Sequence, residues 1–129
     1  MIIDSSAVVA LVEHEPEASR LAEIIKTTET PRMSVANWLE TCLVLDKRTP
    51  EHPRKLDELV KDLRIELVPV DLTQARVARD AHRRYGRNSG SPAKLNYGDC
   101  FAYALAITTG DTLLFKGEDF THTDVLPAA

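Results

Sequence analysis

Short apolar runs alternate along the chain with longer segments in which apolar residues recur three and four positions apart. The short runs predict strands at residues 1–3, 31–33, 65–70 and 112–115, and residues 124–126 predict a further edge strand. The longer segments predict helices at residues 7–12, 16–28, 34–47, 50–63, 72–85 and 99–107. Strands that alternate with helices indicate a three-layer α/β/α fold, with a central parallel sheet of four to five short strands.

Polar residues stand where several of these helices begin. Asp4 or Ser5 suits the N-cap of the first helix, and Ser34 suits the N-cap of the third. Asp99 lies in the first turn of a helix that is apolar on nearly every face, where the helix dipole favours an anion. Glu40 interrupts the apolar stripe of the third helix, so we expect its carboxylate to turn inward.

The composition is that of an ordinary globular protein. With 129 residues, 43% of them hydrophobic and 28% charged, we expect residues 1–129 to form a single domain around one core. No apolar run approaches the roughly 20 residues of a membrane span, and the N-terminus opens directly on a predicted strand, so we expect a cytoplasmic protein without a membrane segment. Cys42 and Cys100 fall in apolar helical segments, which favours reduced core thiols.

The charge is unevenly distributed. The formal net charge of −4 argues against a protein that binds nucleic acid by bulk electrostatics. Residues 76–94 are nevertheless locally +5, because five Arg and one Lys are opposed only by Asp80. This segment is either a basic rim beside an acidic pocket or simply a solvated helix face.

Four acids are candidates for chemistry in a chain that has no Gly-rich phosphate loop and no closely spaced His and Cys ligands. Asp4 and Asp119 each follow a predicted strand, and Asp99 and Glu40 lie on helices that start from the same edge of the sheet. Carboxylates held together there would repel one another unless a hard cation such as Mg²⁺ or Mn²⁺ bound between them. Singly, three of them have a simpler explanation: Asp4 as a cap, Asp99 as a first-turn acid and Asp119 as a turn residue. Glu40 is the hardest of the four to explain structurally.

Four sequence blocks together resemble the PIN-domain ribonucleases, and within them the VapC toxins of bacterial VapBC toxin-antitoxin modules. The blocks are MIIDSSAVVA at residues 1–10, SVANWLE at 34–40, LNYGDCFAYALA at 95–106 and LLFKGEDFTHTD at 113–124. Their order and spacing match the family over nearly the full chain. The resemblance implies a PIN-like fold and a Mg²⁺-dependent endoribonuclease.

The resemblance also assigns residues. It implies that Asp4, Glu40, Asp99 and Asp119 are catalytic metal ligands, directly or through water. The polar residues that would flank the site are Ser6, Asn96 and Lys116. Glu118 stands where the family often has Asn.

The implied reaction is hydrolysis of RNA phosphodiester bonds by a metal-activated water. From the basic segment we expect RNA contacts by Arg83, Arg84 and Arg87. The family further implies a homodimer and a hetero-oligomer in which a VapB-like antitoxin covers the site. Two interpretations compete for Val8, Leu11, Leu21 and Ile25, namely an antitoxin groove and plain core packing.

Two other classes of function remain open at this point. A receiver-type phosphoacceptor domain also has a parallel sheet, acids at strand ends, bound Mg²⁺ and a late Lys such as Lys116. It requires an acidic pair after the first strand, however, whereas Asp4 is followed by two Ser residues. A catalytically silent binding domain with the same fold is the other alternative.

Overall fold

The computed structural model describes residues 1–48 and 52–129, so the predicted start of the fourth helix at residue 50 lies outside the described part. Strands and helices alternate as expected. The elements in chain order are β1 (Ile2–Ile3), α1 (Ser5–Val12), α2 (Ala18–Lys26), β2 (Arg32–Ser34), α3 (Val35–Asp46), α4 (His52–Asp62), β3 (Glu66–Val68), α5 (Leu72–Tyr85), α6 (Tyr97–Thr109), β4 (Leu113–Leu114) and the 3-10 helix η1 (Asp119–His122).

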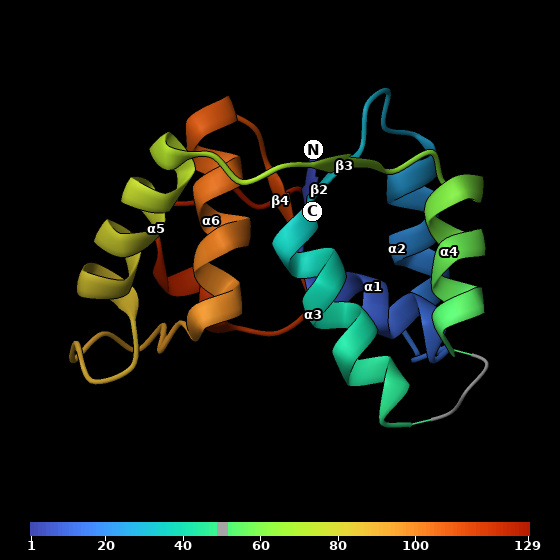
Figure 1. The fold of residues 1–129 in the computed structure, drawn as a ribbon, viewed down its shortest axis with the longest axis horizontal. Coiled ribbons are helices and arrows are strands. Elements are labelled where there is room, and N and C mark those ends of the chain that lie inside the picture. The colour runs from blue at the N-terminus through green and yellow to red at the C-terminus, as the bar shows by residue number, and fades with distance from the viewer. Residues whose placement is uncertain (49–51) are drawn as a thin grey trace.

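The four described strands form one parallel sheet in the order β3-β2-β1-β4. In Figure 1 the strands lie at the centre, with α5 and α6 on one side and α1, α2, α3 and α4 on the other. The predicted three-layer α/β/α fold with a parallel sheet is therefore confirmed.

The two faces of the sheet bury separate clusters because successive strand residues point in opposite directions. Ile2 and Leu113 pack with α5 and α6, whereas Ile3 and Leu114 pack with α1 and its neighbours. Helix α6 is buried along most of its length, as its apolar sequence predicts, and Tyr103 at its centre is 2% exposed.

Some sequence expectations are corrected. Residues 124–126 do not form a strand; the chain instead makes a single parallel bridge between Leu113 and Pro127. The four apolar residues on α1 and α2 are buried, as the core-packing interpretation predicts: Val8, Leu11, Leu21 and Ile25. Leu11 and Leu21 also line surface cavities, so the antitoxin-groove interpretation stays a prediction. Both cysteines are free thiols. None of the described helices has the length and apolar character needed to cross a membrane.

Candidate metal centre

Asp4 stands at the carboxyl end of β1 and is the N-cap of α1. Its Oδ2 accepts a hydrogen bond from the Ser6 backbone N–H at 3.0 Å, and the residue is only 2% exposed. Oδ1 is buried and has no hydrogen-bond partner among the described residues. Burial raises the pKa of Asp4, and the charge of Glu40 raises it further against the opposing hydrogen bonds from Ser6. A buried carboxylate with one unpartnered oxygen is costly, and a bound cation would relieve that cost.

Glu40 lies on α3, which begins directly at the end of β2. Its Oε1 accepts a hydrogen bond of 2.6 Å from the Ser5 hydroxyl, next in sequence to Asp4. The Asn37 amide lies one turn earlier on the same helix, and its Nδ2 approaches Glu40 Oε1 at 3.4 Å. The expectation that Glu40 turns inward therefore agrees with the structure, and Ser5 links it to the first acid.

Asp99 heads α6 in a reciprocal capping box with Asn96. Asp99 Oδ2 accepts from the Asn96 N–H at 2.9 Å, and Asn96 Oδ1 accepts from the Asp99 N–H at 2.8 Å. Desolvation by burial raises the pKa of Asp99 to about 7; the Asn96 hydrogen bond opposes this rise, and the charges of Asp4, Glu40 and Asp119 add to it. Burial is thus the main cause of the raised pKa of Asp99, and the charges of the other three acids act in the same direction.

Asp119 is the outermost of the four acids. It opens η1 after β4, its side chain is exposed, and its charge makes the smallest of the carboxylate contributions to the Asp99 pKa. Glu118 is also exposed, and its side chain makes no capping hydrogen bond to η1. The structure thus places Asp4, Glu40 and Asp99 within electrostatic reach of one another and leaves Asp119 exposed at the edge.

An open cavity of about 360 Å³ lies beside Glu40 and Asp99, whereas Asp4 and Asp119 are not among the residues that line it. Glu40, Asp99 and Asn96 line it together with Ser5 and Ser6. The Ser6 hydroxyl accepts a hydrogen bond from the Lys116 backbone N–H at 3.0 Å, which ties the start of α1 to the segment after β4.

Two cations stand on the rim of this cavity, and each is paired with acids outside the cluster. Lys116 Nζ lies 3.0 Å from Glu15 Oε1 and 2.7 Å from Glu17 Oε1. Arg48 forms an ion pair with Glu13. The charge of the acidic cluster is therefore not neutralised by either cation.

The donor set fits a hard cation, although the carboxylates stand apart. Among the residues that the structure describes, no three His, Cys, Asp or Glu side chains lie close enough together to hold a metal ion as they stand. The unpartnered Asp4 oxygen and the raised pKa of Asp99 nevertheless indicate a site that is short of positive charge. Oxygen ligands of this kind suit Mg²⁺ or Mn²⁺.

Two residues that support the cluster were missed from the sequence. Asn37 is fully buried and donates through Nδ2 to the Gly98 carbonyl at 2.9 Å, which joins α3 to α6 beside Glu40. Gly98 leaves room for the Glu40 carboxylate, because a Cβ there would lie 1.8 Å from Oε2. The sequence did hold a signal for Gly98, because Gly is an unfavourable residue within a helix and its presence there indicates a close neighbour.

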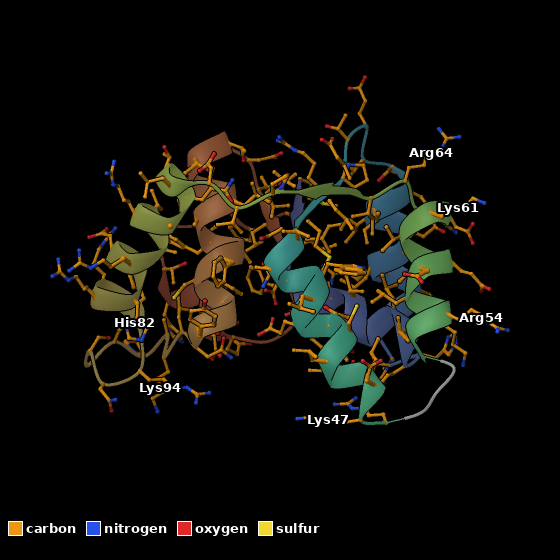
Figure 2. The ribbon with its side chains drawn as sticks, viewed as in Figure 1. Lys47, Arg54, Lys61, Arg64, His82 and Lys94 are labelled. Atoms are coloured by element: carbon orange, nitrogen blue, oxygen red, sulfur yellow. The ribbon has the colours of Figure 1, made fainter. Side chains whose placement is uncertain are left out.

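The three arginines expected to contact RNA have different surroundings. Arg84 binds the Tyr85 hydroxyl at 2.8 Å and lies 3.5 Å from Asp80 and 3.6 Å from Asp124. Arg83 is exposed on α5, and Arg87 is exposed at a shallow cavity that Lys94 also lines. Figure 2 shows Lys94 and His82 near the same end of the α5 and α6 layer.

Residues 1–126 match the family described as PIN domain. The chain is 50% identical over 129 residues to Ribonuclease VapC42 of Mycobacterium tuberculosis, covering 99% of this chain and 98% of that protein. It is 45% identical over 126 residues to Ribonuclease VapC28 of the same organism, covering 97% and 95% respectively.

Solved structures share the fold at low sequence identity. Mycobacterium tuberculosis VapC20, a sarcin-ricin loop cleaving toxin, superposes with a TM-score of 0.78 at 13% identity, covering 97% of this chain and 95% of that one. VapBC2 from Rickettsia felis, bound to a DNA fragment from its promoter, gives 0.77 at 15% identity, covering 98% and 94%.

Proposed function

The chain belongs to the PIN domain family, and on that premise we propose that it is a metal-dependent endoribonuclease toxin of the VapC type. It hydrolyses RNA phosphodiester bonds. The observation that carries this proposal is the buried Asp4 carboxylate, whose unpartnered oxygen lies in the same acidic environment as Glu40 and Asp99.

In this proposal the acids hold Mg²⁺ or Mn²⁺. Asp4, Glu40 and Asp99 would hold the ion directly, and the exposed Asp119 would act through water. Held there, such an ion would supply a water of lowered pKa and would offset the negative charge of the scissile phosphate. The Ser5 hydroxyl and the Asn96 N–H fix one oxygen of Glu40 and of Asp99 respectively, which limits the rotation of both carboxylates.

RNA reaches an acidic cavity only if cations hold its neighbouring phosphates. The exposed guanidinium groups of Arg83 and Arg87 serve that purpose, whereas Arg84 is engaged by Asp80, Asp124 and Tyr85. The open cavity suits an unpaired loop or single strand better than a duplex. Because the substrate is RNA, we place the activity in the cytoplasm.

We assign partner contacts to an apolar stripe on α3. Val35, Leu39 and Leu43 recur every four residues and are 38%, 52% and 55% exposed. A homodimer would bury this stripe. A VapB-like antitoxin would then cover the metal centre within a hetero-oligomer and keep the enzyme inactive.

No observation favours the receiver-type phosphoacceptor. The Lys116 ammonium group, which a receiver would direct into its acidic pocket, is bound by Glu15 and Glu17 instead. A catalytically silent binding domain is distinguished by the following experiment.

Wild-type protein and Asp99→Asn are incubated with transfer, ribosomal and messenger RNA, and new 5′ ends are mapped with Mg²⁺ and with EDTA. We expect new ends from the wild type with Mg²⁺ alone. Identical ends from both proteins, or cleavage that persists in EDTA, would overturn the catalytic assignment. No cleavage by either protein would favour the silent binding domain.

A further inference from the structure

A second cavity, of about 500 Å³, lies between α5 and α6. Its floor is apolar, with Ala78 from α5 and Cys100 from α6, both of them buried. Its walls are the aromatic rings of Tyr97 and Phe101 on one side and the cations Arg79 and Arg83 on the other. The volume is in the range of small-ligand sites, and the acidic cluster does not contribute to the lining.

The aromatic wall is unusually accessible. Tyr97 is 80% exposed, the highest value among the large hydrophobic residues at the surface. Its ring meets Phe101 edge to face, with 5.0 Å between the centroids and an interplanar angle of 85°. One ring thus supports the other, and a flat face of Tyr97 remains free to stack against a ligand.

The cationic wall carries charge that the protein does not neutralise. Arg79 and Arg83 are one helical turn apart on α5, and neither forms an ion pair among the residues that the structure describes. His82 lies beside them, and Figure 2 shows it at the end of α5 toward the loop that carries Lys94. Arg84, the next residue on the helix, faces other partners and does not line the cavity.

The cavity adjoins the metal centre through a single turn of helix. Tyr97 and Asp99 both belong to the first turn of α6, about 3 Å apart along the helix axis but about 200° apart around it, so their side chains lie on different sides of the helix start. Tyr97 lines the second cavity and Asp99 lines the first. A nucleic-acid strand that crosses the N-terminal end of α6, with its scissile phosphate at Asp99, would place a flanking nucleotide on the other side of the helix at Tyr97.

We propose that the cavity between α5 and α6 binds one unpaired nucleobase flanking the scissile phosphate, stacked on Tyr97, with its phosphate held by Arg79 and Arg83. This inference rests on the proposed ribonuclease function and adds a base subsite to it. Aromatic faces combined with cations are the usual means of binding single-stranded RNA, because every base offers a π-face. The two unneutralised arginines favour this polyanionic ligand over an apolar protein segment.

The test measures binding of fluorescein-labelled poly(A) and poly(U) by anisotropy. All proteins carry Asp99→Asn so that the RNA stays intact, and double-stranded RNA serves as a competitor. Tyr97→Ala should weaken binding by about 5- to 150-fold, the range found for loss of one stacking partner, and Tyr97→Phe should retain it. Arg83→Gln should weaken binding several-fold, whereas Lys61→Gln, with the same change of charge on the far side of the molecule in Figure 2, should not.

Each alternative result is distinct. Equal affinities for all variants, or no binding by the protein with Tyr97 and Arg83 intact, would overturn the proposed subsite. A change from dimer to monomer in Tyr97→Ala, seen by sedimentation without a loss of RNA affinity, would assign the cavity to a second copy and overturn the proposal as well. Failure of the ribonuclease function itself is read separately, from the cleavage assay with Asp99 intact.

Discussion

The Glu40 carboxylate lies against the backbone of Gly98, so closely that a Cβ atom at residue 98 would stand 1.8 Å from Glu40 Oε2. Gly98→Ala must therefore displace this carboxylate. Because Glu40 is a flexible side chain and Ala is the better helix former by roughly 1 kcal/mol, we expect little loss of thermal stability. Misplacing a reacting group by 1 Å can cost on the order of 100-fold in rate, so kcat/KM and Mg²⁺ affinity should fall strongly.

A double-mutant cycle separates this effect from a general disturbance of α6. In a Glu40→Ala background, Gly98→Ala has no carboxylate to displace and should leave Mg²⁺ affinity, measured by calorimetry, unchanged. If Gly98→Ala and Glu40→Ala instead lowered Mg²⁺ affinity additively, residue 98 would act on the metal site independently of the Glu40 carboxylate.

The raised pKa of Asp99 predicts how the stability of the metal-free protein depends on pH. Its pKa is about 7 in the folded protein and roughly 3.9 in an unfolded chain, so the native state binds more protons between these values. The free energy of unfolding should then decrease as pH rises from about 4 to about 7. Thermal melts in EDTA should show this decrease for the wild type and a flatter profile for Asp99→Asn. Mg²⁺ should restore stability above pH 7 in the wild type only.

The four acids should contribute unequally. Asp99 is partly buried and shares its environment with Asp4 and Glu40, so Asp99→Asn should lower kcat by at least 100-fold. Asp119 is exposed and contributes least of the three carboxylates to the raised pKa of Asp99, so Asp119→Asn should cost about 10- to 100-fold, as expected for a water-mediated ligand. Single-turnover rates at saturating Mg²⁺ measure both, and equal losses would argue that Asp119 is a direct ligand.

Arg84 should behave as a structural residue. It bridges Asp80, Asp124 and the Tyr85 hydroxyl, with its guanidinium 4.8 Å from the Tyr85 ring centre. Arg84→Gln should lower the melting temperature and leave RNA affinity close to that of the wild type. Arg87→Gln should lower RNA affinity and leave the melting temperature close to that of the wild type, since Arg87 is exposed. A similar loss of RNA affinity in both variants would show that Arg84 also contacts RNA.

The sequence predicted the alternating strands and helices of the parallel sheet, because both kinds of element follow local patterns. A metal site formed by the four acids stays a prediction. Asp4 and Ser34 are caps that can be recognised from their neighbours. The pairing of α3 with α6 depends on contacts between residues 61 positions apart, such as Asn37 and Gly98, and no local pattern encodes it. The burial of Val8 and Ile25 was likewise ambiguous, because an apolar helix face looks the same whether it meets a core or a partner.

Asn37 tests whether this long-range contact serves the metal centre. Asn37→Ala removes a fully buried amide that bonds the Gly98 carbonyl and approaches Glu40, which should cost about 1–3 kcal/mol of stability. Thr41→Val is the matched control: Thr41 is also fully buried on α3 and donates to the Asn37 carbonyl, but the structure gives it no hydrogen bond to Glu40. Both variants should have a lower melting temperature than the wild type. Only Asn37→Ala should also lose Mg²⁺ affinity, since it removes a contact that limits the rotation of the Glu40 carboxylate. Equal Mg²⁺ affinities in the two variants would show that Asn37 contributes to stability alone.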